Sequence, residues 1–239
     1  MPSIETQKLL EVWETMWNRT PCEQAVGLVA ATFPELSPSE VVALPIGRRD
    51  ALLLRLRALL FGTRADMLAR CPDCQEQCEL TINVLDLELE PTPLAPFSVA
   101  FKDREYLFRL PNSSDILRLS QHDTASPQCA LIAGCYMSGA AEQEDEILSD
   151  KAFLNAVMEE MEEQDPQANI EFSLNCAHCH HCWDLPFDIT SYLWSELNSW
   201  ARRLLGEIHT LASTYGWSEG AILSMSTTRR QIYLNLATG

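Results

Sequence analysis

Two Cys-x-x-Cys pairs, far apart in the chain, constrain its fold more than any other feature. The first pair is Cys71 and Cys74, and the second is Cys176 and Cys179. A spacing of two residues lets both sulfurs turn toward one point, so two such pairs supply the four thiolates of a tetrahedral Zn²⁺ site. If both pairs bind one ion, the chain between them is an insertion whose ends are held together.

The sequence around each pair has the alternating pattern of a strand. Apolar residues alternate from residue 170 to 174 and again from 183 to 187, on either side of the second pair. Residues 79–89 alternate after the first pair, with a shift of register. We therefore expect two hairpins tipped by cysteine knuckles, which together form a split zinc ribbon. A hairpin alone buries too little surface to fold without the ion.

Other interpretations of the cysteines are weaker. A redox dithiol of the thioredoxin type lies at the start of a helix in a βαβ pattern, and neither pair does. Cys182 can replace Cys179, and a histidine can join a second ion, so the ligand set has alternatives. We expect the two Cys-x-x-Cys pairs to bind the zinc and the nearby groups to lie beside the ion or at the surface; these groups are Cys78, Cys182, His178, His180 and His181.

Composition indicates an ordinary folded protein that lies in the cytoplasm. The chain has 239 residues, of which 46% are hydrophobic, and no apolar run approaches the roughly 18 residues of a membrane span. The first ten residues lack the layout of a secretion signal. Metal binding is therefore a better explanation of the nine cysteines than disulfides. Cys22, Cys129 and Cys135 stand alone, and we expect them to be small buried hydrophobes.

The charge is strongly negative and unevenly distributed. A formal charge of −17 argues against general nucleic-acid binding. Residues 48–70 hold six arginines against two aspartates, whereas residues 142–171 hold eleven acids against Lys151. Each segment is either a solvated face or a surface that docks a protein partner of opposite charge.

Helical periodicity and capping residues predict that the rest of the chain is mainly helical, giving an α+β fold. We expect helices at 3–33 (two), 37–43, 48–61, from about 116, 127–137, 150–163 and from 189 onward, followed by two short helices capped by Ser218 and Ser226. A further hairpin is expected at 97–110. The predicted regions are an N-terminal helical region (1–62), the split ribbon (63–90 and 168–188), an inserted hairpin with helices (91–167) and a C-terminal helical bundle (189–239).

No motif in the sequence is typical of an active site. There is no Gly-rich phosphate loop, no His-Glu-x-x-His and no nucleophile elbow. Asp188, Glu196 and His209 form a triad only on paper, because lone ionisable residues are more often solvated or capping. Four thiolates close the coordination shell of a zinc ion, whereas a catalytic zinc keeps an open position. We therefore expect a protein that is not an enzyme.

Several segments resemble a known family. These are residues 44–62 leading into the first knuckle, residues 187–205 following the second, and the ending Tyr215-Gly-Trp-Ser-Glu219 with Arg229-Arg-Gln-Ile-Tyr-Leu234. Together they are similar to the T-even-type phage baseplate proteins encoded with contractile tails and contractile injection systems. The resemblance covers roughly residues 44–90 and 168–236.

The resemblance implies a non-enzymatic component or assembly factor of the baseplate or its hub. Its partners would be other baseplate or hub proteins, and it would be incorporated into a tail-like particle. From the residues alone, we expect an interaction module, with Tyr215, Trp217 and Tyr233 either a docking surface or core packing against the long helix. The alternative is a zinc-ribbon adaptor that binds nucleic acid or a transcription-linked protein.

Overall fold

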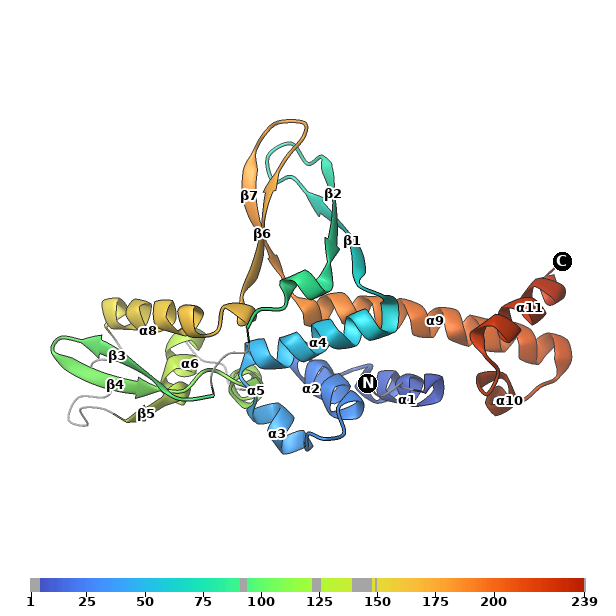
Figure 1. Cartoon of the computed structure of the whole chain (residues 1–239), viewed down its shortest axis with the longest axis horizontal. Coiled ribbons are helices and arrows are strands. Elements are labelled where there is room, and N and C mark those ends of the chain that lie inside the picture. The colour runs from blue at the N-terminus through green and yellow to red at the C-terminus, as the bar shows by residue number, and fades with distance from the viewer. Residues whose placement is uncertain (1–4, 91–93, 122–125, 139–147, 149, 239) are drawn as a thin grey trace. The chain divides into compact units, whose positions relative to one another are not determined.

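The computed structural model describes residues 5–90, 94–121, 126–138, 148 and 150–238 (Figure 1). The chain separates into two compact units, residues 20–190 and residues 1–19 with 191–239. The described elements are mostly helices, with three small antiparallel sheets, as the predicted α+β class requires. Within this part of the chain, no helix is both long and apolar enough to cross a membrane.

Helix α4 is central to the larger unit. It spans Ile46–Phe61 and packs against α2 (Pro21–Thr32), η1 (Val84–Leu87) and η3 (Pro166–Ala168). Its leucines Leu53, Leu54 and Leu56 are fully buried. Gly62 ends the helix at φ 86°, a conformation that favours glycine. The short helix α3 (Pro38–Ala43), which was predicted at 37–43, precedes it and begins with a capping box of Ser37 and Glu40.

Gly47 lies where the start of α4 meets a buried carboxylate. The Gly47 amide donates to Asp165 Oδ2 at 2.9 Å, and Asp165 is 3% exposed. A Cβ added at Gly47 would overlap Asp165 Oδ1. The position therefore has room for glycine alone.

Substituting Gly47 with alanine should destabilise the protein by about 1–3 kcal/mol, because the added methyl group displaces Asp165. The matched control is Gly206→Ala in the middle of α9 (Ile189–Tyr215), where an added Cβ meets nothing within 4 Å. That change should stabilise its helix by up to about 1 kcal/mol. Denaturant unfolding followed by circular dichroism measures both, and equal effects would show that the space around Gly47 is not the reason.

The inserted segment forms a sheet covered by helices. Strands β3 (Phe97–Phe101), β4 (Arg104–Phe108) and β5 (Tyr136–Ser138) are antiparallel in that order, and α8 (Lys151–Gln164) packs on β3. Phe108 and Phe153 are buried at the centre of this core, with Val99, Tyr106, Ile132, Leu154 and Val157 around them. Lys102 and Asp103 both have positive φ, which suits the tight turn of the predicted hairpin.

Three boundaries differ from the predicted ones. The strand expected over 79–89 ends at Asn83, where β2 (Gln77–Asn83) gives way to η1, so the shift of register marks a 3₁₀ turn. The helix expected to Met137 is α6 (Pro127–Cys135), and Tyr136 begins strand β5, which the sequence analysis missed. Helix α5 (Ser113–Gln121) starts one turn earlier than expected. The first part of the acidic segment 142–171, residues 142–147 and 149, lies outside the described residues.

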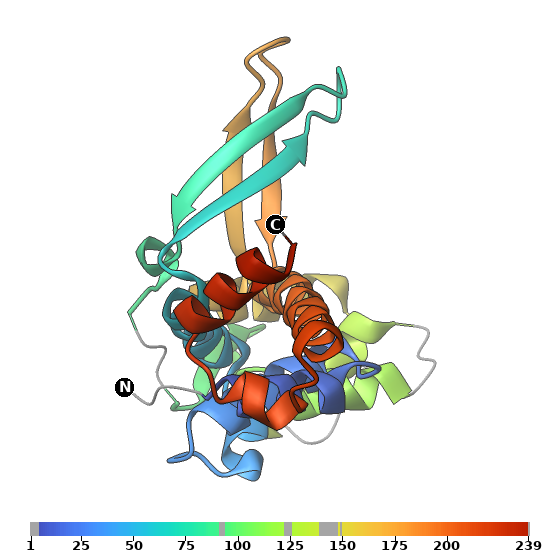
Figure 2. The same ribbon diagram turned by 90° about the vertical axis from the view of Figure 1, so that its right-hand side faces the viewer.

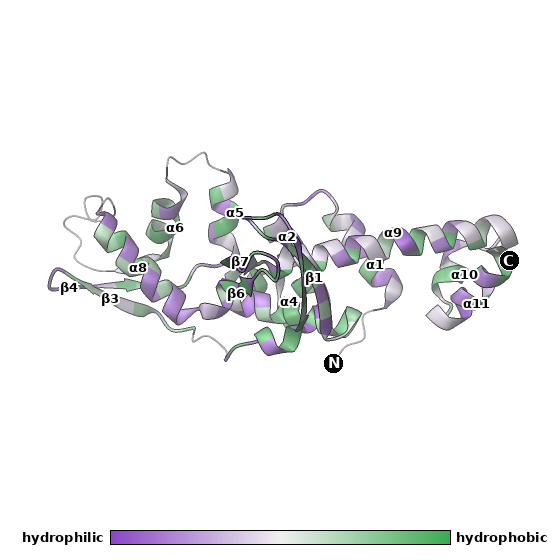
Figure 3. Cartoon of the chain, turned by 90° about the horizontal axis from the view of Figure 1, so that it is seen from above, coloured by the Kyte–Doolittle hydropathy of each residue, from purple (hydrophilic) through white to green (hydrophobic). Residues whose placement is uncertain are grey.

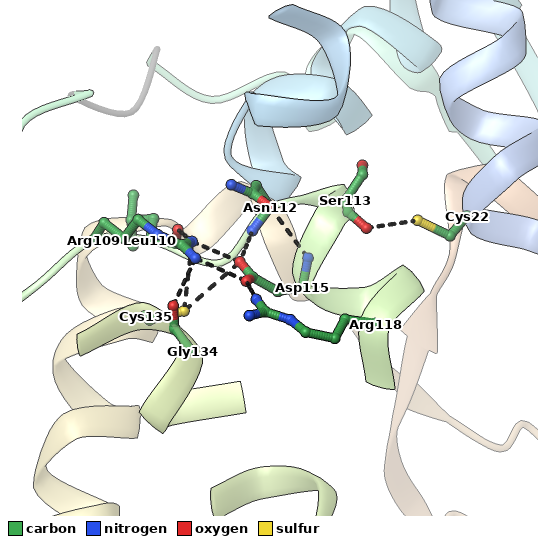
Figure 4. A network of polar contacts seen from close by, with 9 residues as sticks. All are labelled: Cys22, Arg109, Leu110, Asn112, Ser113, Asp115, Arg118, Gly134 and Cys135. Atoms are coloured by element: carbon green, nitrogen blue, oxygen red, sulfur yellow. Dashed lines mark hydrogen bonds and ion pairs between the residues drawn. The ribbon is translucent and has the colours of Figure 1, made fainter. Parts of the chain in front are cut away.

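The cap of α5 is part of a buried ion-pair network (Figure 4). The Asp115 amide donates to Asn112 Oδ1, and the Asn112 amide donates to Asp115 Oδ2, which is the reciprocal pattern of a capping box. Arg109 donates to both carboxylate oxygens of Asp115, at 2.6 and 2.8 Å, and Arg118 also pairs with it. Arg109 further donates to the Gly134 carbonyl at 2.7 Å. The network thus ties β4, α5 and α6 together.

The smaller unit contains α1 (Thr6–Met16), most of α9, α10 (Glu219–Leu223) and α11 (Thr227–Thr238). Gly216 ends α9 at φ 69°, a conformation that favours glycine. The half-buried rings of Tyr215, Trp217 and Tyr233 pack on one another, with centroids 4.5 Å apart for the first two and 4.8 Å for the last two. These rings therefore join the end of α9 to α11, which favours packing over an open docking surface.

Candidate metal centre

Two hairpins carry the Cys-x-x-Cys pairs. Strands β1 (Arg64–Arg70) and β2 form the first hairpin, and β6 (Ile170–Asn175) and β7 (Cys182–Phe187) form the second. Each is a separate two-stranded antiparallel sheet, so no ladder joins them. They stand side by side with their tips together in both views (Figure 1, Figure 2).

The tips bring four sulfurs together. The Sγ atoms of Cys71, Cys74, Cys176 and Cys179 all lie within 4.8 Å of one another. Cys71 Sγ is 3.6 Å from Cys179 Sγ, and Cys74 Sγ is 3.6 Å from Cys176 Sγ. Four sulfurs placed about 2.3 Å from a central Zn²⁺ are roughly 3.8 Å apart in a tetrahedron. The arrangement therefore fits a single metal ion.

The two knuckles share one backbone conformation. The Cys71 amide donates to the Glu76 carbonyl, and the Cys176 amide donates to the His181 carbonyl, both at 2.9 Å. Gln75 and His180, each directly after the second cysteine of its pair, have φ of 61°. These positions favour glycine, so Gln75 and His180 accept the strain of a left-handed backbone at the point where the chain turns around the sulfurs.

Backbone amides stabilise the thiolate form of Cys176. The amide of Cys179, together with that of His178, donates to the Cys176 sulfur and lowers the pKa of this thiol to about 6. Although the His181 amide lowers the pKa of Cys179, burial and the neighbouring sulfurs raise it to about 12. Thiolates are the form that binds a metal. Cys71 and Cys176 are buried and the other two are half-buried, which leaves little room for water among the sulfurs.

The neighbouring groups lie outside the four-sulfur cluster. Cys182 is exposed and accepts from Asn175 Nδ2 at 3.1 Å, and His178, His180 and His181 are exposed at the tip. The Cys78 sulfur interacts with that of Cys176. Burial, followed by this contact, raises the pKa of Cys78. Within the described residues, the group that could hold a metal ion consists of the two Cys-x-x-Cys pairs alone.

The three solitary cysteines lie away from the four-sulfur cluster and differ in burial. Cys22 and Cys135 are buried and Cys129 is half-buried, so the expectation of burial holds fully for the first two. Burial raises the pKa of Cys135 to about 12, with Asp115 adding to the shift. Burial also raises the pKa of Cys22, so the thiols of Cys22 and Cys135 are protonated at neutral pH.

Some arginines of the segment 48–70 are buried rather than exposed at the surface. Arg49 is 7% exposed and pairs with Asp50 at 2.7 Å. Arg57 is 3% exposed and donates to the carbonyls of Gly62 and Arg64, both at 2.7 Å. Two of the six arginines thus stabilise the ends of α4 internally, a use that the sequence pattern did not reveal.

Comparison with known proteins decides the family. The family model described as T4 bacteriophage base plate protein matches residues 28–192, more than half of the chain. The chain belongs to the T4 bacteriophage base plate protein family. The predicted resemblance is thereby confirmed, and the match also extends over the inserted segment between residues 90 and 168. The match ends before most of α9, so it does not include the C-terminal segment. No curated protein and no solved structure matches the chain.

Membership in the base plate family gives the metal centre its context. The matched region contains both knuckles and all residues between them. The four-sulfur cluster is thus part of the region that defines the family. Base plate proteins are structural components of phage particles, and this supports a structural protein.

Proposed function

We propose that this chain is a non-enzymatic component or assembly factor of the base plate or hub of a contractile phage-tail-like particle, stabilised by one structural Zn²⁺. The ligands in this proposal are Cys71, Cys74, Cys176 and Cys179. The observation that carries it is the base plate family match, which encloses a closed four-sulfur cluster. The partners would be other base plate or hub proteins.

The chemistry of the donor set supports zinc in a structural role. Four cysteine sulfurs suit Zn²⁺ and leave no position for a water molecule, which a catalytic zinc requires. The ion would join two hairpins that share no backbone ladder. A two-stranded hairpin alone is marginal in water. The ion would therefore hold the ribbon together and fix the ends of the inserted segment.

The residues once considered for a triad support a role outside catalysis. Asp188 accepts from the Thr190 amide at 2.9 Å and thus caps the start of α9. Glu196 and His209 both lie on α9, and thirteen residues of helix separate them by about 20 Å. A triad needs its members within hydrogen-bond reach.

The charge on the ribbon favours a protein partner over nucleic acid. Its strands expose Arg64 and Arg70 against a larger number of acids, which are Asp66, Glu79, Glu171 and Asp184. A polyanion binds surfaces on which basic residues prevail. These strands thus disfavour the alternative of a nucleic-acid adaptor.

The proposed role predicts that particles fail to assemble without this protein. Deleting its gene in the organism that encodes it should leave few or no complete contractile particles in electron micrographs, and the wild-type gene should restore them. The double variant Cys71→Ser, Cys176→Ser should not restore them, whereas Cys182→Ser should, because Cys182 lies outside the cluster. Normal numbers of complete, contracting particles in the deletion strain would contradict the proposal.

A further inference from the structure

The smaller unit lies almost entirely outside the region that defines the family. The family model ends at residue 192, whereas this unit consists of residues 1–19 and 191–239. It holds six acids and six lysines or arginines, so the whole formal charge of −17 belongs to the larger unit. The sequence contains no acid after Glu219. An acidic partner would therefore meet less repulsion on the smaller unit than on the larger one.

One face of α11 packs on α9. Arg230 is 4% exposed, pairs with Glu207 of α9 at 3.4 Å and donates to the Met225 carbonyl at 3.2 Å. The Tyr215 hydroxyl at the end of α9 donates to the Tyr233 carbonyl at 3.4 Å. These contacts fix the rotation of α11 about its own axis. The side chains on its other faces therefore have a defined direction.

The neighbouring face of α11 is apolar and exposed. Ile232 is 56% exposed and Leu236 is 69% exposed, and a spacing of four positions places them side by side. Arg229, which is also exposed, lies three positions before Ile232. The spacing of these three residues is that of the seam between two packed helices. Figure 3 shows both hydrophilic and hydrophobic residues on this helix. Together, Arg229, Ile232 and Leu236 form what we call the outer seam of α11.

The charge of the outer seam favours an acidic partner. The Arg229 guanidinium lies over the Tyr233 ring, 5.7 Å from its centroid, and is thereby held beside the apolar pair. Residues 220–239 contain no aspartate or glutamate. A second α11 packed against the first would thus offer Arg229 no side-chain carboxylate. A helix with an acid next to its apolar residues would complement both parts of the seam.

The size of the outer seam also argues against a dimer held by α11 alone. Three side chains on two turns of helix cover far less than the about 800 Å² that each partner buries in a stable interface. A contact of this size is effective where other contacts already hold the same partners together, because the second contact is then intramolecular. This condition is met within an assembly of several proteins.

We propose that the outer seam of α11 docks an acidic amphipathic helix of another base plate protein. Apolar side chains of that helix would cover Ile232 and Leu236, and one of its carboxylates would pair with Arg229. This is the helix-to-helix mode of recognition, in which anchors three, four and seven positions apart determine the fit. The inference rests on the proposed function for the class of partner, and its tests are separate from the deletion phenotype.

The direct test is cross-linking from the seam itself. The variant Leu236→p-benzoyl-L-phenylalanine is expressed in the deletion strain and irradiated while particles assemble. Mass spectrometry should map the cross-link to an acidic amphipathic segment of another base plate protein. The control places the same group at Thr214, an exposed position of α9, and should not give this product. A product no more abundant than in the control, or a cross-link to a second copy of this chain, would overturn the proposal.

Charge reversal at Arg229 tests the acidic character of the partner. The Arg229 amide donates to Ser226 Oγ at 3.3 Å, so a glutamate here would complete a capping box and keep α11 stable. Arg229→Glu should lower the yield of the cross-link about tenfold, because it would place two carboxylates together. Arg229→Lys keeps the charge and should retain most of the yield. A yield in Arg229→Glu equal to that of the wild type would overturn the proposal.

A double variant tests whether the seam is needed for assembly. Ile232→Gln with Leu236→Gln should leave the melting temperature of the purified protein unchanged, because both positions are exposed and glutamine is a good helix former. It should restore at least about fivefold fewer complete particles to the deletion strain than Thr214→Gln does. Full assembly by the double variant would overturn the proposal. It would not affect the proposed structural function, which the deletion phenotype tests.

Discussion

Removing the metal should unfold both hairpins of the ribbon. Each hairpin is an isolated two-stranded sheet, and the four-sulfur cluster joins them at their tips. Binding of a structural Zn²⁺ contributes on the order of 10 kcal/mol in small zinc domains, more than a marginal hairpin can replace. Chelation should therefore abolish the protection of the amides in residues 64–83 and 170–187 against hydrogen exchange.

Substituting the cluster cysteines should have the same effect as removing the metal with a chelator. Replacing both Cys71 and Cys176 with serine should yield insoluble protein, because each Cys-x-x-Cys pair then loses its buried sulfur. The control is Cys182→Ser, which removes an exposed thiol seen outside the cluster and should leave solubility and metal content unchanged. A soluble double variant that melts cooperatively without metal would contradict the role given to the ion.

The second large effect is expected at Asp115. Its side chain is 1% exposed and receives hydrogen bonds from Arg109, Arg118 and the Asn112 amide. Asp115→Asn should destabilise the protein by about 3 kcal/mol, at the low end of the range for broken buried pairs because both arginines remain partly exposed. The melting temperature should fall by roughly 6–12 °C in differential scanning calorimetry.

Asp66, a surface carboxylate that also pairs with an arginine, provides the control for Asp115. Asp66 pairs with Arg64 at 3.0 Å and accepts from Thr81, but its side chain is 65% exposed. Asp66→Asn should therefore change stability by less than about 1 kcal/mol. If both variants melt at the same temperature, the buried network does not stabilise the inserted segment.

The pH dependence of the Asp115 contribution has a defined sign. Burial raises the pKa of Asp115, but hydrogen bonds from Arg109 and Asn112 outweigh burial and hold the pKa below its ordinary value. A carboxyl whose pKa is lower in the folded state stabilises the fold above the unfolded value of about 3.9 and loses that contribution as the pH falls through the folded value. The stability difference between wild type and Asp115→Asn should thus be full at pH 7 and shrink below about pH 4.

The candidate site could be predicted from sequence because its signal is local. A spacing of two residues between cysteines, flanked by alternating strands, identifies each half of the cluster. A tetrahedral zinc site needs four sulfurs, so the two halves were expected to meet. The long helix α9 was equally accessible, since its apolar periodicity marks it from residue 189 onward. These features depend on residues that are neighbours in the chain.

What the sequence analysis missed depends on contacts between distant segments. Strand β5 has three residues and exists because it pairs with β4, far away in the chain. Helix α5 was expected from about residue 116, whereas Asn112 and Asp115 cap it earlier, and Arg109 holds the Asp115 carboxylate in place. The role of Asp165 at Gly47 is likewise invisible in a pattern of neighbours, because the two residues are 118 positions apart.

The most direct test of the central claim is the metal content and ligand set of the purified native protein. Elemental analysis should find one zinc per chain, and X-ray absorption at the zinc edge should show four sulfur ligands at about 2.3 Å. Protein that is folded and active in particle assembly but holds no metal would contradict the account. So would a zinc ion bound by nitrogen or oxygen in place of the cysteine sulfurs.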